Sequence, residues 1–146
     1  RLSPVSTIHY KARDGLDIAA VLTLPAGKDP KNLPFILLPH GGPFARDAER
    51  WDWWVQFLAW RGYAVLQPNY RGSSGFGTAF AEKGEGQWGL AMQDDLNDAV
   101  DWAVKQGIAD PGRVCMVARR RGARPSGTAP DIAAPYPMPA CPTLAR

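Results

Sequence analysis

Short apolar runs separated by polar segments predict the strands of the first part of the chain. Thr7–Tyr10 and Ile18–Leu24 are strand-like runs on either side of Asp14-Gly15, a dipeptide that favours a turn with positive φ. This pair therefore predicts a hairpin. Phe35–Leu38 and Tyr63–Leu66 are wholly apolar, which is typical of strands that are buried on both faces.

Helical spacing appears between these runs. Residues 51–61 predict a helix that ends at Gly62, and the apolar positions from Leu96 to Val104 predict another that ends at Gly107. Residues 72–86 are rich in Gly and Ser and predict a loop. A turn at Asp110–Gly112 then leads into a last strand, Val114–Val117.

This order of elements predicts an α/β fold, with an N-terminal hairpin followed by parallel strands and crossover helices. Phe35–Leu38, Tyr63–Leu66 and Val114–Val117 are expected to be parallel neighbours in one sheet with helices on both faces. Periodicity is absent after Val117, where prolines, arginines and small residues dominate. Residues 1–117 are therefore expected to form the domain, and residues 118–146 a disordered tail.

Composition and charge say little about the partners, cofactors or location of the protein. The net charge of +3 and the isoelectric point of about 9.1 come from the tail, which has five arginines and one acidic residue. Such a tail is weak evidence for a nucleic-acid partner, and none is expected. No apolar run reaches 18 residues, so no membrane span is expected. The sequence indicates no cofactor, metal site or cellular compartment.

His40-Gly41-Gly42-Pro43 directly follows a predicted buried strand. Glycines there allow a tight turn with accessible N–H groups, which acyl-transfer enzymes use to hold an oxyanion. Gly41 and Gly42 are therefore candidates for an oxyanion hole, and the alternative is an ordinary Gly-Pro turn.

A second candidate segment follows Tyr63–Leu66. Asn69, Tyr70 and Arg71 leave the carboxyl end of that strand, where open α/β sheets bind ligands, and are candidate substrate-binding residues. The alternative for Arg71 is an ion pair with Asp94 or Asp95. The tryptophans of the first helical segment are interpreted as packing residues rather than a ligand platform. They are Trp51, Trp53, Trp54 and Trp60.

Together these motifs resemble the prolyl oligopeptidase family of serine peptidases, in particular its acylaminoacyl-peptidase and dipeptidyl-peptidase-like members. The resemblance covers about residues 5–117 and rests on the order and spacing of five segments. These are Leu38–Phe44, Arg61–Val65, Pro68–Gly77, Trp88-Gly89 with Asp94-Asp95, and Asp110–Val114. It implies the N-terminal part of an α/β-hydrolase catalytic domain.

The chain departs from this family after Val117. The family would continue with a Gly-x-Ser-x-Gly-Gly turn, yet the chain contains no Gly-x-Ser-x-Gly, and its only histidines are His9 and His40. The tail has the composition of GC-rich DNA translated out of frame. Reading with a two-base offset and free choice of synonymous codons permits the missing turn from Val117 to Ala123. A frameshift after Val117 is therefore expected.

The resulting interpretation is a truncated serine-peptidase domain that has no catalytic residues of its own. The full-length relative would act on peptides. One alternative is a carboxylesterase- or lipase-like hydrolase fragment, and another is a non-catalytic interaction module on a hydrolase scaffold. Because the later strands are missing, the chain is expected to associate with itself through an exposed sheet edge.

Overall fold

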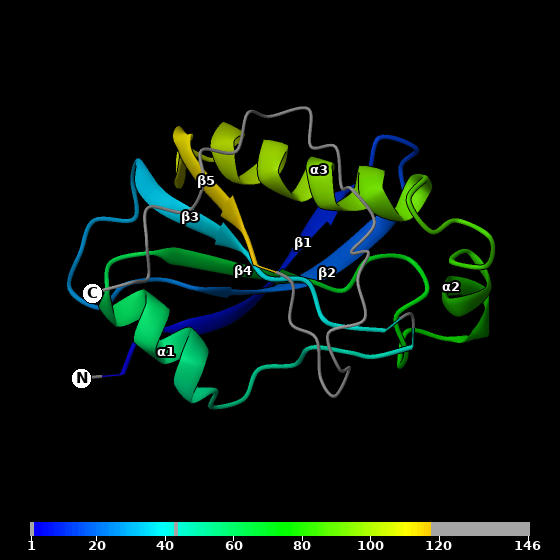
Figure 1. Cartoon of the computed structure of the whole chain (residues 1–146), viewed down its shortest axis with the longest axis horizontal. Coiled ribbons are helices and arrows are strands. Elements are labelled where there is room, and N and C mark those ends of the chain that lie inside the picture. The colour runs from blue at the N-terminus through cyan, green and yellow to red at the C-terminus, as the bar shows by residue number, and fades with distance from the viewer. Residues whose placement is uncertain (1, 43, 118–146) are drawn as a thin grey trace, which may run out of the picture.

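A five-stranded mixed sheet forms the centre of the structure, a computed structural model that describes residues 2–42 and 44–117. The strands lie in the order β1-β2-β4-β3-β5, as Figure 1 shows. Every residue of the predicted tail, 118–146, lies outside the described residues. The predicted boundary at residue 117 therefore stays a prediction.

The predicted hairpin is confirmed. Strands β1 (Val5–Lys11) and β2 (Asp17–Thr23) are antiparallel, in a register that runs from Val5 opposite Thr23 to Lys11 opposite Asp17. Gly15 adopts a φ of 86° in the connecting turn, a conformation that costs glycine little. On its other side β2 pairs with β4 in antiparallel fashion, so the hairpin is joined to the parallel strands.

The parallel arrangement is confirmed as well. Strand β3 (Leu33–Leu37) lies between β4 (Ala64–Pro68) and β5 (Ala109–Met116) and is parallel to both. The predicted turn at Asp110–Gly112 is a bulge inside β5 rather than a separate turn. There the Gly112 N–H donates to Oδ1 of Asp110 at 2.9 Å, and the β3–β5 register shifts.

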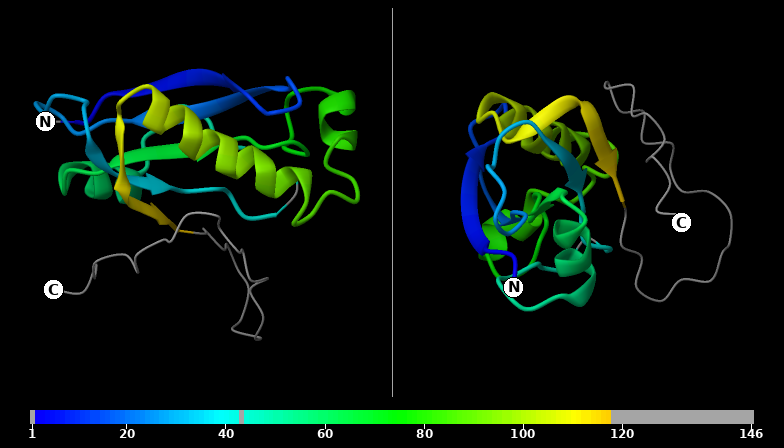
Figure 2. Two further views of the ribbon diagram at one scale, coloured as in Figure 1. Left: turned by 90° about the horizontal axis from the view of Figure 1, so that it is seen from above. Right: turned by 90° about the vertical axis from the view of Figure 1, so that its left-hand side faces the viewer.

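Two helices cover opposite faces of the sheet (Figure 2). Helix α1 (Trp53–Trp60) begins at Asp52, whose carboxylate accepts the N–H groups of Trp54 and Val55. Helix α3 (Ala91–Lys105) packs on the larger core, which also contains the inward side chains of the hairpin. A short helix that the sequence did not predict, α2 (Thr78–Glu82), lies within the Gly-rich segment.

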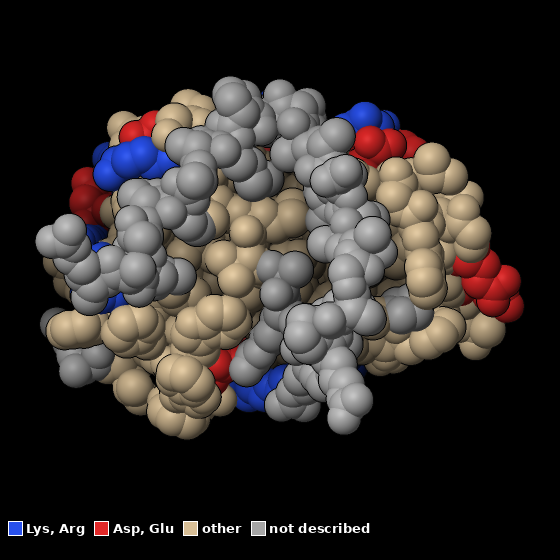
Figure 3. Space-filling view, in the orientation of Figure 1, with Lys and Arg blue, Asp and Glu red and all other residues tan. Residues whose placement is uncertain are grey.

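The interpretation of the tryptophans as packing residues is wrong for three of the four. Trp51, Trp53 and Trp60 are 67%, 64% and 74% exposed. A helix of eight residues presents only one face to the sheet, and α1 uses Val55, Leu58 and Ala59 for that face. Figure 3 shows that the described surface on its viewed side is largely uncharged, with acidic and basic groups at the rim.

Among the described residues, no helix has the length and apolar character that crossing a bilayer requires.

Candidate functional site

The loops that follow β3 and β4 meet at the carboxyl end of these parallel strands. Asn69 joins them through its side-chain amide: its Oδ1 accepts the Asp47 N–H at 2.8 Å, and its Nδ2 donates to the Asp47 carbonyl at 2.9 Å. The Ser74 N–H also donates to the Ala45 carbonyl at 3.2 Å. Asn69 is 2% exposed, so its amide groups are used within the protein and stabilise the contact between the two loops.

Tyr70 anchors the glycine loop, residues 40–42, from the protein interior. Its hydroxyl donates to the His40 carbonyl at 2.9 Å and lies 3.3 Å from the Gly42 carbonyl. Its ring stacks on the His40 imidazole with centroids 4.6 Å apart. The carbonyl groups of this loop are therefore directed towards the protein interior.

The N–H groups of Gly41 and Gly42 remain without a hydrogen-bond partner among the described residues, and both glycines are exposed. Gly42 has a φ of 83°, so a side chain at this position would be strained, although no atom lies within 4 Å of the point that a Cβ would occupy. The loop thus presents backbone donors to solvent while its carbonyls are bound, as an anion-binding turn requires.

His40 and Ser73 form a buried, hydrogen-bonded pair. The distance between their side chains is that of a catalytic dyad, but the direction of the hydrogen bond is not. Nε2 of His40 lies 2.8 Å from Oγ of Ser73. The Ser73 hydroxyl donates its single proton to the Tyr70 carbonyl at 2.6 Å, so it accepts a hydrogen bond from the His40 ring. A general base accepts the serine proton, whereas here the histidine donates, and Ser73 is fully buried.

Burial also sets the charge of this cluster. It lowers the pKa of His40, and the backbone acceptors of Gly42 and Gly41 partly oppose this by favouring the protonated ring. Burial raises the pKa of Tyr70 to about 12, and the Asp47 carboxylate adds to that rise. His40 and Tyr70 are therefore both neutral near pH 7, and a neutral Tyr70 hydroxyl can donate to the His40 carbonyl.

Arg71 turns away from the glycine loop. Its guanidinium and backbone N–H bind the fully buried carboxylate of Asp95, with the closest contact at 2.7 Å. A further contact at 2.9 Å reaches Asp14 in the hairpin turn. Hydrogen bonding to Asp95 raises the pKa of Arg71, and the bond from Arg71 lowers the pKa of Asp14. The ion pair with Asp95 that the sequence offered as an alternative is present, whereas Asp94 contacts Arg13.

The structure thus brings Tyr70 and Asn69 to the loop that carries Gly41 and Gly42, and places Arg71 at the contact between hairpin and α3. Neither Ser73 nor Asp14 was singled out from the sequence as part of these networks. The His40 partner of Ser73 and the Arg71 partner of Asp14 lie 33 and 57 positions away, so no local spacing signals these contacts. No three His, Cys, Asp or Glu side chains are placed to hold a metal within residues 2–42 and 44–117.

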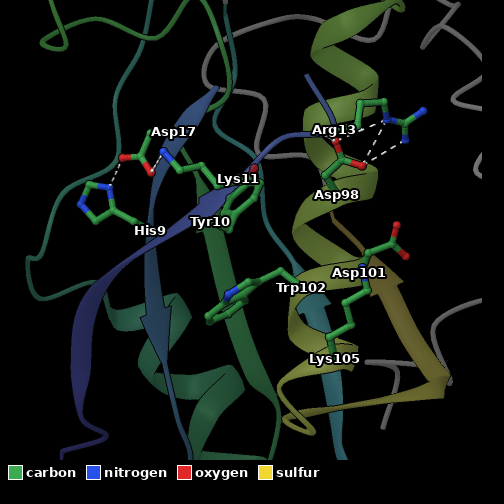
Figure 4. Close-up of a pocket in the computed structure, with 9 residues that line it drawn as sticks. All are labelled: His9, Tyr10, Lys11, Arg13, Asp17, Asp98, Asp101, Trp102 and Lys105. Atoms are coloured by element: carbon green, nitrogen blue, oxygen red, sulfur yellow. Dashed lines mark hydrogen bonds and ion pairs between the residues drawn. The ribbon is translucent and has the colours of Figure 1, made fainter. Parts of the chain in front are cut away.

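A separate cavity of about 700 Å³ lies between β1 and α3, away from the glycine loop (Figure 4).

Comparison with known proteins agrees with this geometry. Residues 49–118 match the prolyl oligopeptidase family. Dipeptidyl aminopeptidase BIII of Pseudoxanthomonas mexicana is 44% identical over 123 residues, which cover 80% of this chain and 18% of that protein. The acylamino-acid-releasing enzyme of Sus scrofa is 34% identical over 122 residues, which cover 83% of this chain and 17% of that protein.

The fold is similar to a solved structure of a puromycin hydrolase. The TM-score is 0.74 at 28% sequence identity, and the match covers 80% of this chain and 18% of that one. The chain therefore spans less than a fifth of the length of these relatives.

Proposed function

Because the chain belongs to the prolyl oligopeptidase family of serine peptidases and holds part of its α/β-hydrolase domain, we propose that the His40–Gly42 loop is an oxyanion-binding element for acyl transfer from peptides. In the whole protein a serine would attack the peptide carbonyl and a histidine would take its proton. The loop would then donate a backbone N–H to the oxygen that gains charge.

One observation carries this proposal. The N–H groups of Gly41 and Gly42 have no partner among the described residues, while Tyr70 binds the neighbouring carbonyls from the interior. Backbone donors that are held in place before the reaction need no reorganisation when charge develops, which is what makes an oxyanion hole effective. A Gly-Pro turn with only a structural role does not require free N–H groups on a loop whose carbonyls are anchored.

The 146-residue chain itself is proposed to have no peptidase activity. It contains no Gly-x-Ser-x-Gly turn, and the buried pair of Ser73 and His40 has the hydrogen-bond direction opposite to that of a nucleophile and its base. An oxyanion donor without an activated nucleophile cannot replace the missing step. The family match ends at residue 118, which supports the proposed change of reading frame after Val117.

Restoring the family reading frame after Val117, together with the catalytic half of a relative, tests the proposal. That protein is expected to react with a fluorophosphonate probe at the recovered serine. Gly42→Pro removes the N–H and is expected to lower kcat by about 10²–10³. Since proline also cannot adopt the positive φ of Gly42, Gly42→Ala is the control, because it keeps the N–H and adds only backbone strain.

Equal losses in Gly42→Pro and Gly42→Ala would show that backbone conformation, rather than the N–H, matters. An unchanged kcat in both would leave His40–Gly42 with a turn-forming role only. A restored protein that hydrolyses carboxylic esters but no peptide would favour the esterase alternative.

We also propose that the chain associates with itself through the sheet edge formed by β5. This strand ends the described sheet beside β3. Edge strands pair readily with other chains when nothing covers them. The exposed aromatic residues Trp53, Phe57 and Trp60 on α1 add apolar surface that would favour association.

A further inference from the structure

The position of Ser73 is fixed by the peptide unit between Tyr70 and Arg71. The Ser73 hydroxyl and the Ser73 N–H both donate to the Tyr70 carbonyl, at 2.6 Å and 3.1 Å. The other polar group of this peptide unit, the Arg71 N–H, donates to Oδ2 of Asp95 in α3 at 3.0 Å. Because a peptide unit is planar, bonds at both of its ends fix its orientation, and the Ser73 oxygen is fixed with it.

The backbone beside Ser73 is also held closely by the turn that follows α2. The Gly72 N–H donates to the Phe80 carbonyl at 3.1 Å. A side chain at Gly84 would place its Cβ only 2.5 Å from the Gly72 Cα and 3.0 Å from the Arg71 carbonyl oxygen, so this turn packs directly on the segment. Ser73 is itself fully buried and cannot reach a substrate.

Ser73 and Tyr70 together hold His40 at two points. The Tyr70 hydroxyl donates to the His40 carbonyl at 2.9 Å, and the Ser73 oxygen lies 2.8 Å from Nε2 of the His40 ring. Since the Ser73 proton is directed at the Tyr70 carbonyl, the proton between Ser73 and His40 belongs to Nε2. Both the main chain and the ring of His40 are therefore bonded.

The bond to the ring supplies a constraint that the Tyr70 hydroxyl alone cannot. That hydroxyl lies 2.9 Å from the His40 carbonyl and 3.3 Å from the Gly42 carbonyl. A hydroxyl has one proton, so it cannot donate fully to both carbonyls at once. A second fixed point on His40 is needed if the loop is to keep one conformation.

We propose that Ser73 is a positioning residue for the oxyanion-binding loop. By accepting the Nε2 proton, Ser73 fixes the His40 imidazole, and through the His40 main chain it keeps the Gly42 N–H directed at the place where the oxyanion forms. Ser73 itself donates nothing to the substrate. This inference rests on the proposed oxyanion role of the His40–Gly42 loop.

The hydrogen bond can be tested in the 146-residue chain without any reaction. Nitrogen-15 NMR at neutral pH is expected to show His40 protonated at Nε2 and not at Nδ1. The chain has two histidines, so His9→Gln identifies the His40 signals. Ser73→Ala is expected to speed exchange of the Nε2 proton with water about tenfold or more, whereas the exposed Ser74→Ala is the matched control and is expected to leave the rate unchanged. Protonation at Nδ1, or equal rates in both variants, would overturn the proposal.

Kinetics test the positioning role in the protein with the restored reading frame and catalytic half. Ser73→Ala is expected to lower kcat about tenfold and to leave KM within about twofold, because only the transition state loses an interaction. Gly42→Pro already lacks the donor, so adding Ser73→Ala to it is expected to change kcat by less than about twofold. A role in stability alone would instead lower kcat by the same factor in both backgrounds.

A second pair of variants tests the same hydrogen bond from the His40 side, which matters if Ser73→Ala does not fold. His40→Gln keeps a side-chain N–H that can donate to Ser73, whereas His40→Leu has none. His40→Leu is expected to lower kcat about tenfold more than His40→Gln, and only where Gly42 is intact.

Two results would refute the positioning role and leave the oxyanion role of Gly42 standing. One is an equal effect of Ser73→Ala in both backgrounds, and the other is equal kcat values for His40→Gln and His40→Leu. If Gly42→Pro itself leaves kcat unchanged, the oxyanion proposal fails, and the positioning role of Ser73 fails with it.

Discussion

The Nε2 atom of His40 lies 2.8 Å from the Ser73 hydroxyl, and the proton in this hydrogen bond belongs to the histidine. The hydroxyl proton is directed at the Tyr70 carbonyl 2.6 Å away. This pair therefore stabilises the junction of two loops and leaves Ser73 unactivated.

We expect no labelling of Ser73 or Ser74 when the 146-residue chain is incubated with a fluorophosphonate probe. Ser73 is fully buried and bonded on both sides, and the Ser74 hydroxyl makes no hydrogen bond with a base among the described residues. Intact-mass spectrometry after incubation measures the result. Stoichiometric labelling at either serine would show a nucleophile that uses His40 as its base.

Tyr70→Phe is expected to lower the free energy of unfolding by about 1 kcal/mol, because it removes the donor to the His40 carbonyl but keeps the ring stacked on the imidazole. Urea denaturation gives the stability. Tyr63→Phe is the control, since Tyr63 is half-buried and its hydroxyl makes no hydrogen bond with a described residue. Equal losses in both variants would contradict the anchoring role of Tyr70.

Arg71→Met is expected to destabilise the chain by about 3–5 kcal/mol, because it leaves the buried Asp95 carboxylate without its counter-charge. The double variant Arg71→Met, Asp95→Leu is expected to recover most of this loss. Arg13→Met, at an exposed ion pair, is the control and is expected to change stability much less. If Arg71 bound substrate instead of stabilising the fold, Arg71→Met would leave the thermal midpoint unchanged.

Acidification from pH 7.5 to pH 5 is expected to reduce stability through His40. Its pKa is lowered by burial in the folded chain, so the unfolded chain binds the proton more readily. The stabilisation is complete above the unfolded pKa of about 6.5 and is lost progressively as the pH falls below it. His40→Gln is expected to flatten this dependence, and His9→Gln, at an exposed position, to preserve it. The same slope in His40→Gln and the unmodified chain would locate the effect elsewhere.

Sedimentation of the unmodified chain is expected to show concentration-dependent oligomers, because β5 ends the described sheet. Met116→Lys places a charge near that edge and is expected to reduce association. Val5→Lys, at a half-exposed position on the opposite edge, is the matched control. A monodisperse monomer that melts cooperatively near ~55 °C would contradict association through β5.

The sequence predicted the strands well because buried strands and crossover helices have strong local patterns. The hairpin and the parallel set of β3, β4 and β5 followed from apolar runs and turn residues alone. Helix α2 was missed because it has five residues, no buried side chain and no side-chain cap, so nothing distinguishes it from the surrounding loop. The exposed tryptophans were misjudged because residue type, rather than helical face, guided that interpretation.

The candidate site was predicted only in part for a related reason. Glycines after a buried strand indicated the loop, since their chemistry is local. The partners that fix it are not local: Tyr70 reaches back to His40, and Arg71 joins Asp95 and Asp14 from three different elements. Sequence spacing carries no information on such contacts. The His40–Ser73 hydrogen bond likewise needs the fold, which brings together two residues that lie 33 positions apart.

The position of β3 between β4 and β5 has a consequence for biosynthesis. As the chain leaves the ribosome, β3 can pair with β4 once Pro68 has emerged, but its other edge receives a partner only after Met116 follows. Phe35 and Ile36 thus belong to an apolar strand with one open side throughout synthesis of α3. A nascent chain in this interval offers the kind of unpaired strand that chaperones recognise, and closing so long a segment is intrinsically slow.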